Sequence, residues 1–141
     1  MKSKAPLVMM EQIVMVLIFA LAAALCLQTF ALSGKLSKQT EAKNRAMVEA
    51  QNVAETMKDG GTKAYINLYH AVQKENTWVT WFDADWNATG DDEQAAYCLA
   101  VCPEETETPY LWRAAIVVTA EDGEELARLI AAGQKEVVQN E

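Results

Sequence analysis

The feature of this sequence that most constrains its fold is an apolar run near the N-terminus. The run begins at Leu7, and the twenty residues from Ile13 to Leu32 contain no charge, proline or glycine. A helix of about twenty residues rises roughly 30 Å, which matches the hydrocarbon core of a bilayer. Lipid offers no hydrogen-bond partner to an exposed amide, so such a segment crosses a membrane only as a helix. We therefore predict a short basic leader over residues 1–6 and a transmembrane helix over residues 7–33.

One carboxylate interrupts this run, because Glu11 lies four residues after Leu7. A charge at the edge of a membrane segment is costly unless it reaches the head groups or meets a cation. Two interpretations therefore stay open at this point. Glu11 marks the head-group boundary together with Gln12, or it is a functional residue that pairs with a cation.

Charge is distributed unevenly along the chain, which has a net charge of −8. Residues 1–33 carry +1, residues 34–58 carry +2 and residues 59–141 carry −11. An acidic distal region is not expected to bind nucleic acid or anionic lipid. The length beyond the apolar run allows one domain of about 80 residues, near the lower limit for a core that is stable by itself.

The charges beside the apolar run leave its orientation open. Lys2 and Lys4 precede it, whereas a larger basic group follows it, so the positive-inside rule alone favours a cytoplasmic C-terminus. Residues 31–33 also resemble a signal-peptidase site before Gly34. That alternative is less favoured, because the run is longer than a usual signal segment and carries Glu11.

A helix is expected to continue over residues 34–59, since apolar residues recur there at helical spacing. This stripe is Ala46, Met47, Ala50, Val53, Ala54 and Met57, and we expect Glu49 on the opposite, water-facing side. Asp59-Gly60-Gly61 predicts the end of that helix, because glycine adopts the left-handed conformation of a C-cap. A second, short helix is predicted over residues 62–73, with Tyr65, Leu68, Tyr69 and Val72 on one face.

From Thr77 onward, alternation of side chains predicts strands. We expect strands over residues 77–86, 96–102 and 111–119, the second closed by Pro103, with a turn-rich loop over residues 87–92. Strands at hairpin spacing predict an antiparallel meander. For residues 125–132, Asp122-Gly123 favours a hairpin and a fourth strand, although Asp122 with Glu125 also forms a helix capping box. The expected globular domain covers residues 60–133, and residues 134–141 form a tail.

The remaining residues give little support to an enzyme or a metal site. Cys98 and Cys102 would lie about 13 Å apart in an extended strand, too far for a disulfide. Their spacing is not the usual zinc spacing, and His70 is the sole histidine, so we expect no metal or cofactor. No Ser/His/Asp set or phosphate-binding glycine loop is present, and the acids near residues 83–93 are interpreted as a solvated loop. For the four tryptophans, core packing is favoured over a binding platform.

A basic N-terminus, an apolar segment with an early glutamate and one long helix leading into an antiparallel sheet resemble a type IV pilin-like protein. The resemblance rests on Leu7-Val-Met-Met-Glu11-Gln-Ile-Val-Met-Val-Leu-Ile. In that family a glutamate is the fifth residue of the mature chain, which would make Leu7 the first mature residue. The family has glycine before the cut, whereas this chain has Pro6.

The resemblance implies an α+β fold, in which the C-terminal half of a long N-terminal helix packs on a small antiparallel sheet. It implies that a prepilin peptidase cuts between Pro6 and Leu7, and that Glu11 neutralises the amino terminus of a neighbouring subunit. The partners would be the lipid bilayer and other pilin-like subunits, in a pilus, competence or type II secretion-like assembly. The N-terminus would be cytoplasmic and the globular domain extracytoplasmic.

A second interpretation belongs to a different class. The chain is then an unprocessed single-span membrane protein, whose extracytoplasmic domain binds another protein.

Overall fold

The protein is described by a computed structural model that covers residues 4–135. Residues 1–3 of the expected leader and residues 136–141 of the expected tail lie outside the described range. The elements are α1 (Ala5–Tyr69), β1 (Val72–Lys74), β2 (Thr77–Phe82), β3 (Ala88–Thr89), β4 (Tyr97–Glu104), β5 (Leu111–Ala120) and β6 (Glu125–Gln134). A long N-terminal helix packs on a six-stranded antiparallel sheet, so the expected α+β class is confirmed.

The chain divides into two compact units, and the boundary follows Glu41. In the first unit, α1 begins at Ala5, and almost all of its side chains are exposed. This apolar part of α1 is long enough to cross a membrane. The outward-facing leucine, isoleucine and phenylalanine side chains are therefore suited to lipid or to other apolar helices.

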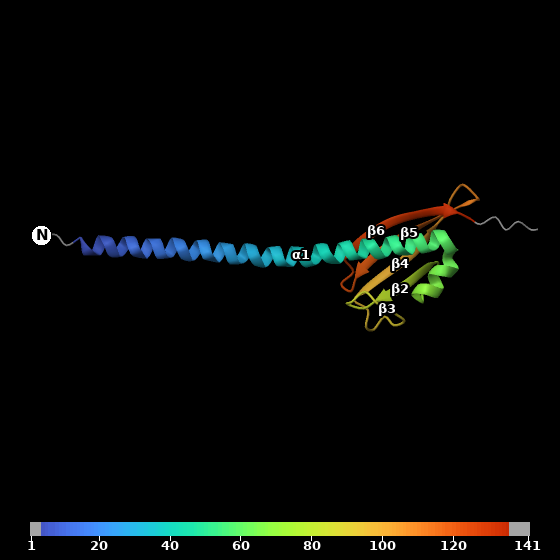
Figure 1. Cartoon of the computed structure of the whole chain (residues 1–141), viewed down its shortest axis with the longest axis horizontal. Coiled ribbons are helices and arrows are strands. Elements are labelled where there is room, and N and C mark those ends of the chain that lie inside the picture. Colours follow the sequence, from blue (N-terminus) through green and yellow to red (C-terminus); the bar gives the residue numbers. More distant parts are fainter. Residues whose placement is uncertain (1–3, 136–141) are drawn as a thin grey trace, which may run out of the picture. The chain divides into compact units, whose positions relative to one another are not determined.

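The second unit contains the rest of α1 and all six strands. Here α1 lies along one face of the sheet, and its final segment turns back at the end of that face (Figure 1). The turn occurs at Gly61, which has φ +66° and ψ −169°. The predicted break at Gly60-Gly61 is thus confirmed, because this backbone conformation is open essentially to glycine alone.

The buried stripe of α1 differs from the prediction at two positions. Ala46, Ala50, Val53, Ala54 and Met57 are buried as expected. Met47 is 36% exposed, whereas Glu49 is only 8% exposed. The expected water-facing position of Glu49 is therefore wrong, because residues 46, 49, 50, 53 and 57 follow the 3.6-residue period more closely than residue 47 does. Arg45 lies 3.6 Å from the Glu49 carboxylate and compensates its charge.

The predicted helix over residues 62–73 is too long. It ends at Tyr69, because His70 adopts a positive φ of 50°, and Val72 pairs with Val79 in the β1–β2 hairpin. Leu68 is 64% exposed, so the expected apolar face is also wrong there. Only the aromatic residues of that face, Tyr65 and Tyr69, contact the core.

The strands follow the predicted antiparallel meander, in the order β1-β2-β4-β5-β6. β3 lies in the predicted loop. It pairs with Trp81 and Phe82 of β2, past the part of β2 that pairs with β1. The hairpin prediction at Asp122-Gly123 is confirmed, since Gly123 has φ +85° and β6 pairs with β5 over residues 125–134. The helical alternative for this segment is wrong.

Two predicted strand ends need correction. β2 ends at Phe82 rather than Trp86, because the Asp83 carboxylate accepts hydrogen bonds from the backbone of Asp85 and Asn87 and closes a turn. Bonds from Asn87 to this carboxylate lower the pKa of Asp83. Pro103 lies within β4 instead of closing it. Pro103 is tolerated because the pairing of β4 with β2 ends at Val101. At Pro103 the only paired neighbour is β5, so the missing amide hydrogen does not interrupt pairing with a second strand.

The core lies between α1 and the inner face of the sheet. Its fully buried side chains include Tyr65, Phe82, Leu99, Val101, Ile116 and Val118. The Tyr65 hydroxyl and Thr80 Oγ1 form a buried hydrogen bond of 2.8 Å. Trp78, Trp86 and Trp112 pack against this core, as predicted for the tryptophans, whereas Trp81 lies on the opposite face with Lys74 above its ring.

Candidate functional site

Glu11 lies near the start of α1, among exposed apolar side chains. A shallow groove runs along one side of the helix there, lined by Leu7, Met10, Glu11, Val14, Met15 and Ile18. These residues share a side because they are spaced three or four apart. The groove therefore offers an apolar surface with a single carboxylate in it.

No ion pair within residues 4–135 includes Glu11. A carboxylate in a hydrocarbon environment is stabilised when a cation and further hydrogen bonds reach it. The geometry on α1 leaves Glu11 accessible to a cation that approaches along the groove.

Both residues of the expected processing site lie in the first turn of α1. Pro6 fits this turn, because proline has no amide hydrogen and the first amides of a helix have no partner within it. Leu7 is 75% exposed and lines the same groove as Glu11. The structure thus brings Leu7 and Glu11 to one surface, and Pro6 does not line it.

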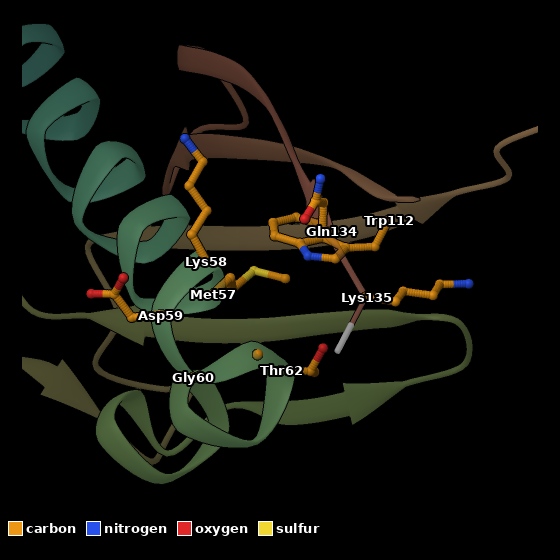
Figure 2. Close-up of a pocket in the computed structure, with 9 residues that line it drawn as sticks. Met57, Lys58, Asp59, Gly60, Thr62, Trp112, Gln134 and Lys135 are labelled. Carbon is orange, nitrogen blue, oxygen red and sulfur yellow. The ribbon is translucent and has the colours of Figure 1, made fainter. Parts of the chain in front are cut away.

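A cavity where α1 breaks is a second candidate site, which was not predicted from the sequence. Its volume is about 320 Å³, and its lining is Met57, Lys58, Asp59, Gly60, Gly61, Thr62, Trp112, Gln134 and Lys135. Figure 2 shows Met57 reaching toward the Trp112 ring, while the ammonium groups of Lys58 and Lys135 point away from each other. The cavity thus has an apolar floor and a polar rim that carries two lysines and one aspartate.

Glycines form this cavity from two sides. Gly60-Gly61 turns α1, and Gly133 in β6 lets the Trp112 indole lie directly on the strand. A Cβ atom at Gly133 would lie 2.6 Å from Trp112 Nε1, closer than side chains approach in proteins. An isolated glycine in a strand pattern often marks such a close approach, so Gly133 was the sequence signal for this site.

Outside the groove and the cavity, the remaining candidates for a functional site among the described residues are metal-ligating side chains and cysteines. Within residues 4–135 there is no group of three His, Cys, Asp or Glu side chains placed to hold a metal ion. The three cysteines, at positions 26, 98 and 102, are free thiols. Burial raises the pKa of the Cys98 thiol, and nearby Lys74 partly offsets this shift.

Comparisons with known proteins leave the family open. No protein-family model matches the chain, and no curated protein or solved structure matches it either.

Proposed function

We propose that this protein is a membrane-anchored structural subunit of a pilin-like assembly, such as a type IV pilus, competence or type II secretion-like machine. The observation that carries the proposal is one carboxylate, Glu11, on an exposed apolar helix that continues into a helix-on-sheet unit. An apolar helix of this length anchors the chain, and a lone carboxylate can fix the register of helices that pack together.

In the proposed mechanism, apolar helices of several subunits bundle through the groove around Glu11. The amino terminus of a neighbouring subunit supplies the cation, and the pair is stabilising because it replaces an unpaired carboxylate in a dry environment. The N-terminus faces the cytoplasm, and the sheet lies on the other side of the membrane.

The first test is the mass of the N-terminal peptide of the full chain, recovered from native membranes. A chain that begins at Leu7 with a methylated amino group supports processing despite Pro6. A chain that retains Met1 or Lys2 contradicts processing and removes the amino terminus that Glu11 would bind.

The second test replaces the carboxylate. We expect Glu11→Ala to leave membrane insertion intact and to abolish co-purification with other pilin-like subunits, whereas Gln12→Ala keeps both. Gln12→Ala is a matched control, because it removes a neighbouring polar side chain without changing the charge of the segment. Unchanged co-purification of Glu11→Ala would contradict the assembly role.

A second candidate function is that of an unprocessed single-span protein with an extracytoplasmic binding module. Pro6 favours it, because the pilin-like family has glycine before the cut, and so does the cavity beside Trp112. Retention of the leader, together with membrane insertion and co-purification of Glu11→Ala that equal those of the unchanged protein, would favour this function over the first.

A further inference from the structure

The cavity at the break of α1 has a floor and a wall that the fold holds in place. Met57 in the floor is 5% exposed, and Trp112 packs against the core. In the wall, a Cβ atom at Gly60 would lie 2.5 Å from Ala64 Cβ, and the φ of +66° at Gly61 is open essentially to glycine. A molecule that enters the cavity therefore meets a preformed surface, which limits the entropy lost on binding.

The size and lining of this cavity suit a small organic molecule. Its volume of about 320 Å³ lies at the lower end of the range for ligand pockets, roughly 300–1,000 Å³. Such pockets combine an apolar surface with a few polar groups that orient the ligand. Here the apolar surface is the Trp112 indole beside Met57, and the Gln134 amide and the Thr62 hydroxyl lie near it (Figure 2). The flat indole favours a flat ring in the ligand.

Two lysines at the rim give the cavity a preference for negative charge. In the described part of the chain, neither Lys58 nor Lys135 has an ion-pair partner. Asp59 also lines the cavity, but its carboxylate points away from the Trp112 ring in Figure 2. The basic side chains within the strands, in contrast, each pair with an acid, namely those of Lys74, Arg113 and Arg128.

We propose that this cavity binds a small organic carboxylate with a flat apolar ring. The ring lies on the Trp112 indole beside Met57. The ammonium groups of Lys58 and Lys135, which point away from each other in Figure 2, turn on their flexible four-carbon stems and donate charge-assisted hydrogen bonds to the carboxylate. A neutral ligand of the same shape makes weaker hydrogen bonds to these ammonium groups, so it binds less tightly.

The test uses 2-naphthoate as the probe and 2-naphthamide as a probe of the same shape without the charge. Each is titrated by calorimetry into the full chain in a neutral detergent, and into empty micelles to subtract partition into the detergent. We expect saturable binding of 2-naphthoate that is at least about tenfold tighter than that of 2-naphthamide. Absence of saturable binding, or equal affinity for the two probes, would overturn the proposal.

Single lysine variants locate the bound carboxylate. Lys58→Gln and Lys135→Gln should each lower the affinity for 2-naphthoate about threefold and leave that for 2-naphthamide unchanged. Lys63→Gln is the matched control, because Lys63 is exposed, lies close in sequence and does not line the cavity. It should bind both probes as the unchanged protein does. Equal affinities of all three variants for 2-naphthoate would overturn the proposal.

This inference goes beyond the proposed assembly and does not rest on it. Glu11 belongs to the other compact unit, so Glu11→Ala should bind 2-naphthoate as the unchanged protein does. Loss of co-purification with intact binding of the probe would support both ideas. Intact binding without any assembly partner would contradict only the assembly, and assembly without binding would contradict only the carboxylate site.

Discussion

At the scale of single residues, the core depends on one buried polar pair. Tyr65 is fully buried, and the only polar atom of its side chain bonds to Thr80, which is also fully buried. Burial raises the pKa of Tyr65 to about 12, while the hydrogen bond with Thr80 opposes the shift. The neutral phenol is thus the form that the folded protein holds.

The raised pKa predicts a loss of stability at alkaline pH. Below about pH 10 the phenol is neutral in both the folded and the unfolded chain, so its full contribution to the free energy of unfolding is present. Between about pH 10 and pH 12 only the unfolded chain releases the proton, and the free energy of unfolding should fall by roughly 2–3 kcal/mol. Denaturant titrations of the full chain in detergent measure this decline.

Tyr65→Phe is the control for that experiment. The variant should lose about 1–2 kcal/mol at neutral pH, because Thr80 is left without its partner. The free energy of unfolding of the variant should also fall less between about pH 10 and pH 12, because the Tyr65 phenol no longer contributes to the decline. An identical decline in the variant would contradict the assignment.

Gly133 gives a second prediction at this scale. Gly133→Ala places a methyl group against the Trp112 indole and should cost about 1–3 kcal/mol of stability, since neither the ring nor the strand can yield freely. Tryptophan fluorescence should report the displaced ring. Gly90→Ala, where nothing lies within 4 Å of the added atom, is the matched control and should change stability little.

At the scale of elements, α1 is governed by two different demands. From Leu7 to Leu32 its side chains are exposed and mostly apolar, and a helix of this kind satisfies its own backbone hydrogen bonds if it lies in lipid. After Ala42 its stripe of small residues packs on the sheet, and Gly61 ends that stripe. One continuous helix thus combines a segment suited to a membrane with a segment suited to a core.

Gly34 and Gly61 of α1 should respond in opposite directions to the same substitution. Gly61→Ala should destabilise the second unit by about 1–3 kcal/mol, because φ +66° with ψ −169° is strained for alanine. Gly34→Ala lies in regular helix with open space around it, so it should be neutral or stabilising by up to about 1 kcal/mol. Equal effects on thermal unfolding would contradict the role of Gly61 as the turn of α1.

At the scale of the whole molecule, the second unit contains a complete core by itself. The α1 stripe, the inner face of the sheet and the hairpins all lie between residues 42 and 135. Its surface is acidic, which favours solubility. The apolar surface of the first unit, in contrast, is suited to a bilayer.

Removal of residues 1–41 should therefore yield a soluble, folded protein. Circular dichroism should show mixed helix and sheet with cooperative unfolding. Size-exclusion chromatography should show a species free of detergent. An aggregated or unfolded fragment would mean that the membrane segment is needed for the core.

The sequence by itself determined the apolar helix, its break at Gly60-Gly61 and the antiparallel strands. These features follow from local chemistry: an uncharged run, the backbone freedom of glycine and side-chain alternation. The same local reasoning identified Glu11, because a carboxylate in an apolar run is conspicuous without any fold, whereas Pro6 and Leu7 were named only through the resemblance to type IV pilin-like proteins. Assembly through Glu11 remains a prediction.

Only the tertiary structure decided the burial of Glu49, the short β1 and β3 and the position of Pro103 within β4. It also decided the cavity beside Trp112. The cavity, for example, depends on residues distant in the sequence, because Gly133 lies against Trp112 only when β5 and β6 pair in one register. Periodicity specifies which side of an element is apolar, whereas the register of the strands specifies which side chains meet, and that register is a property of the folded chain.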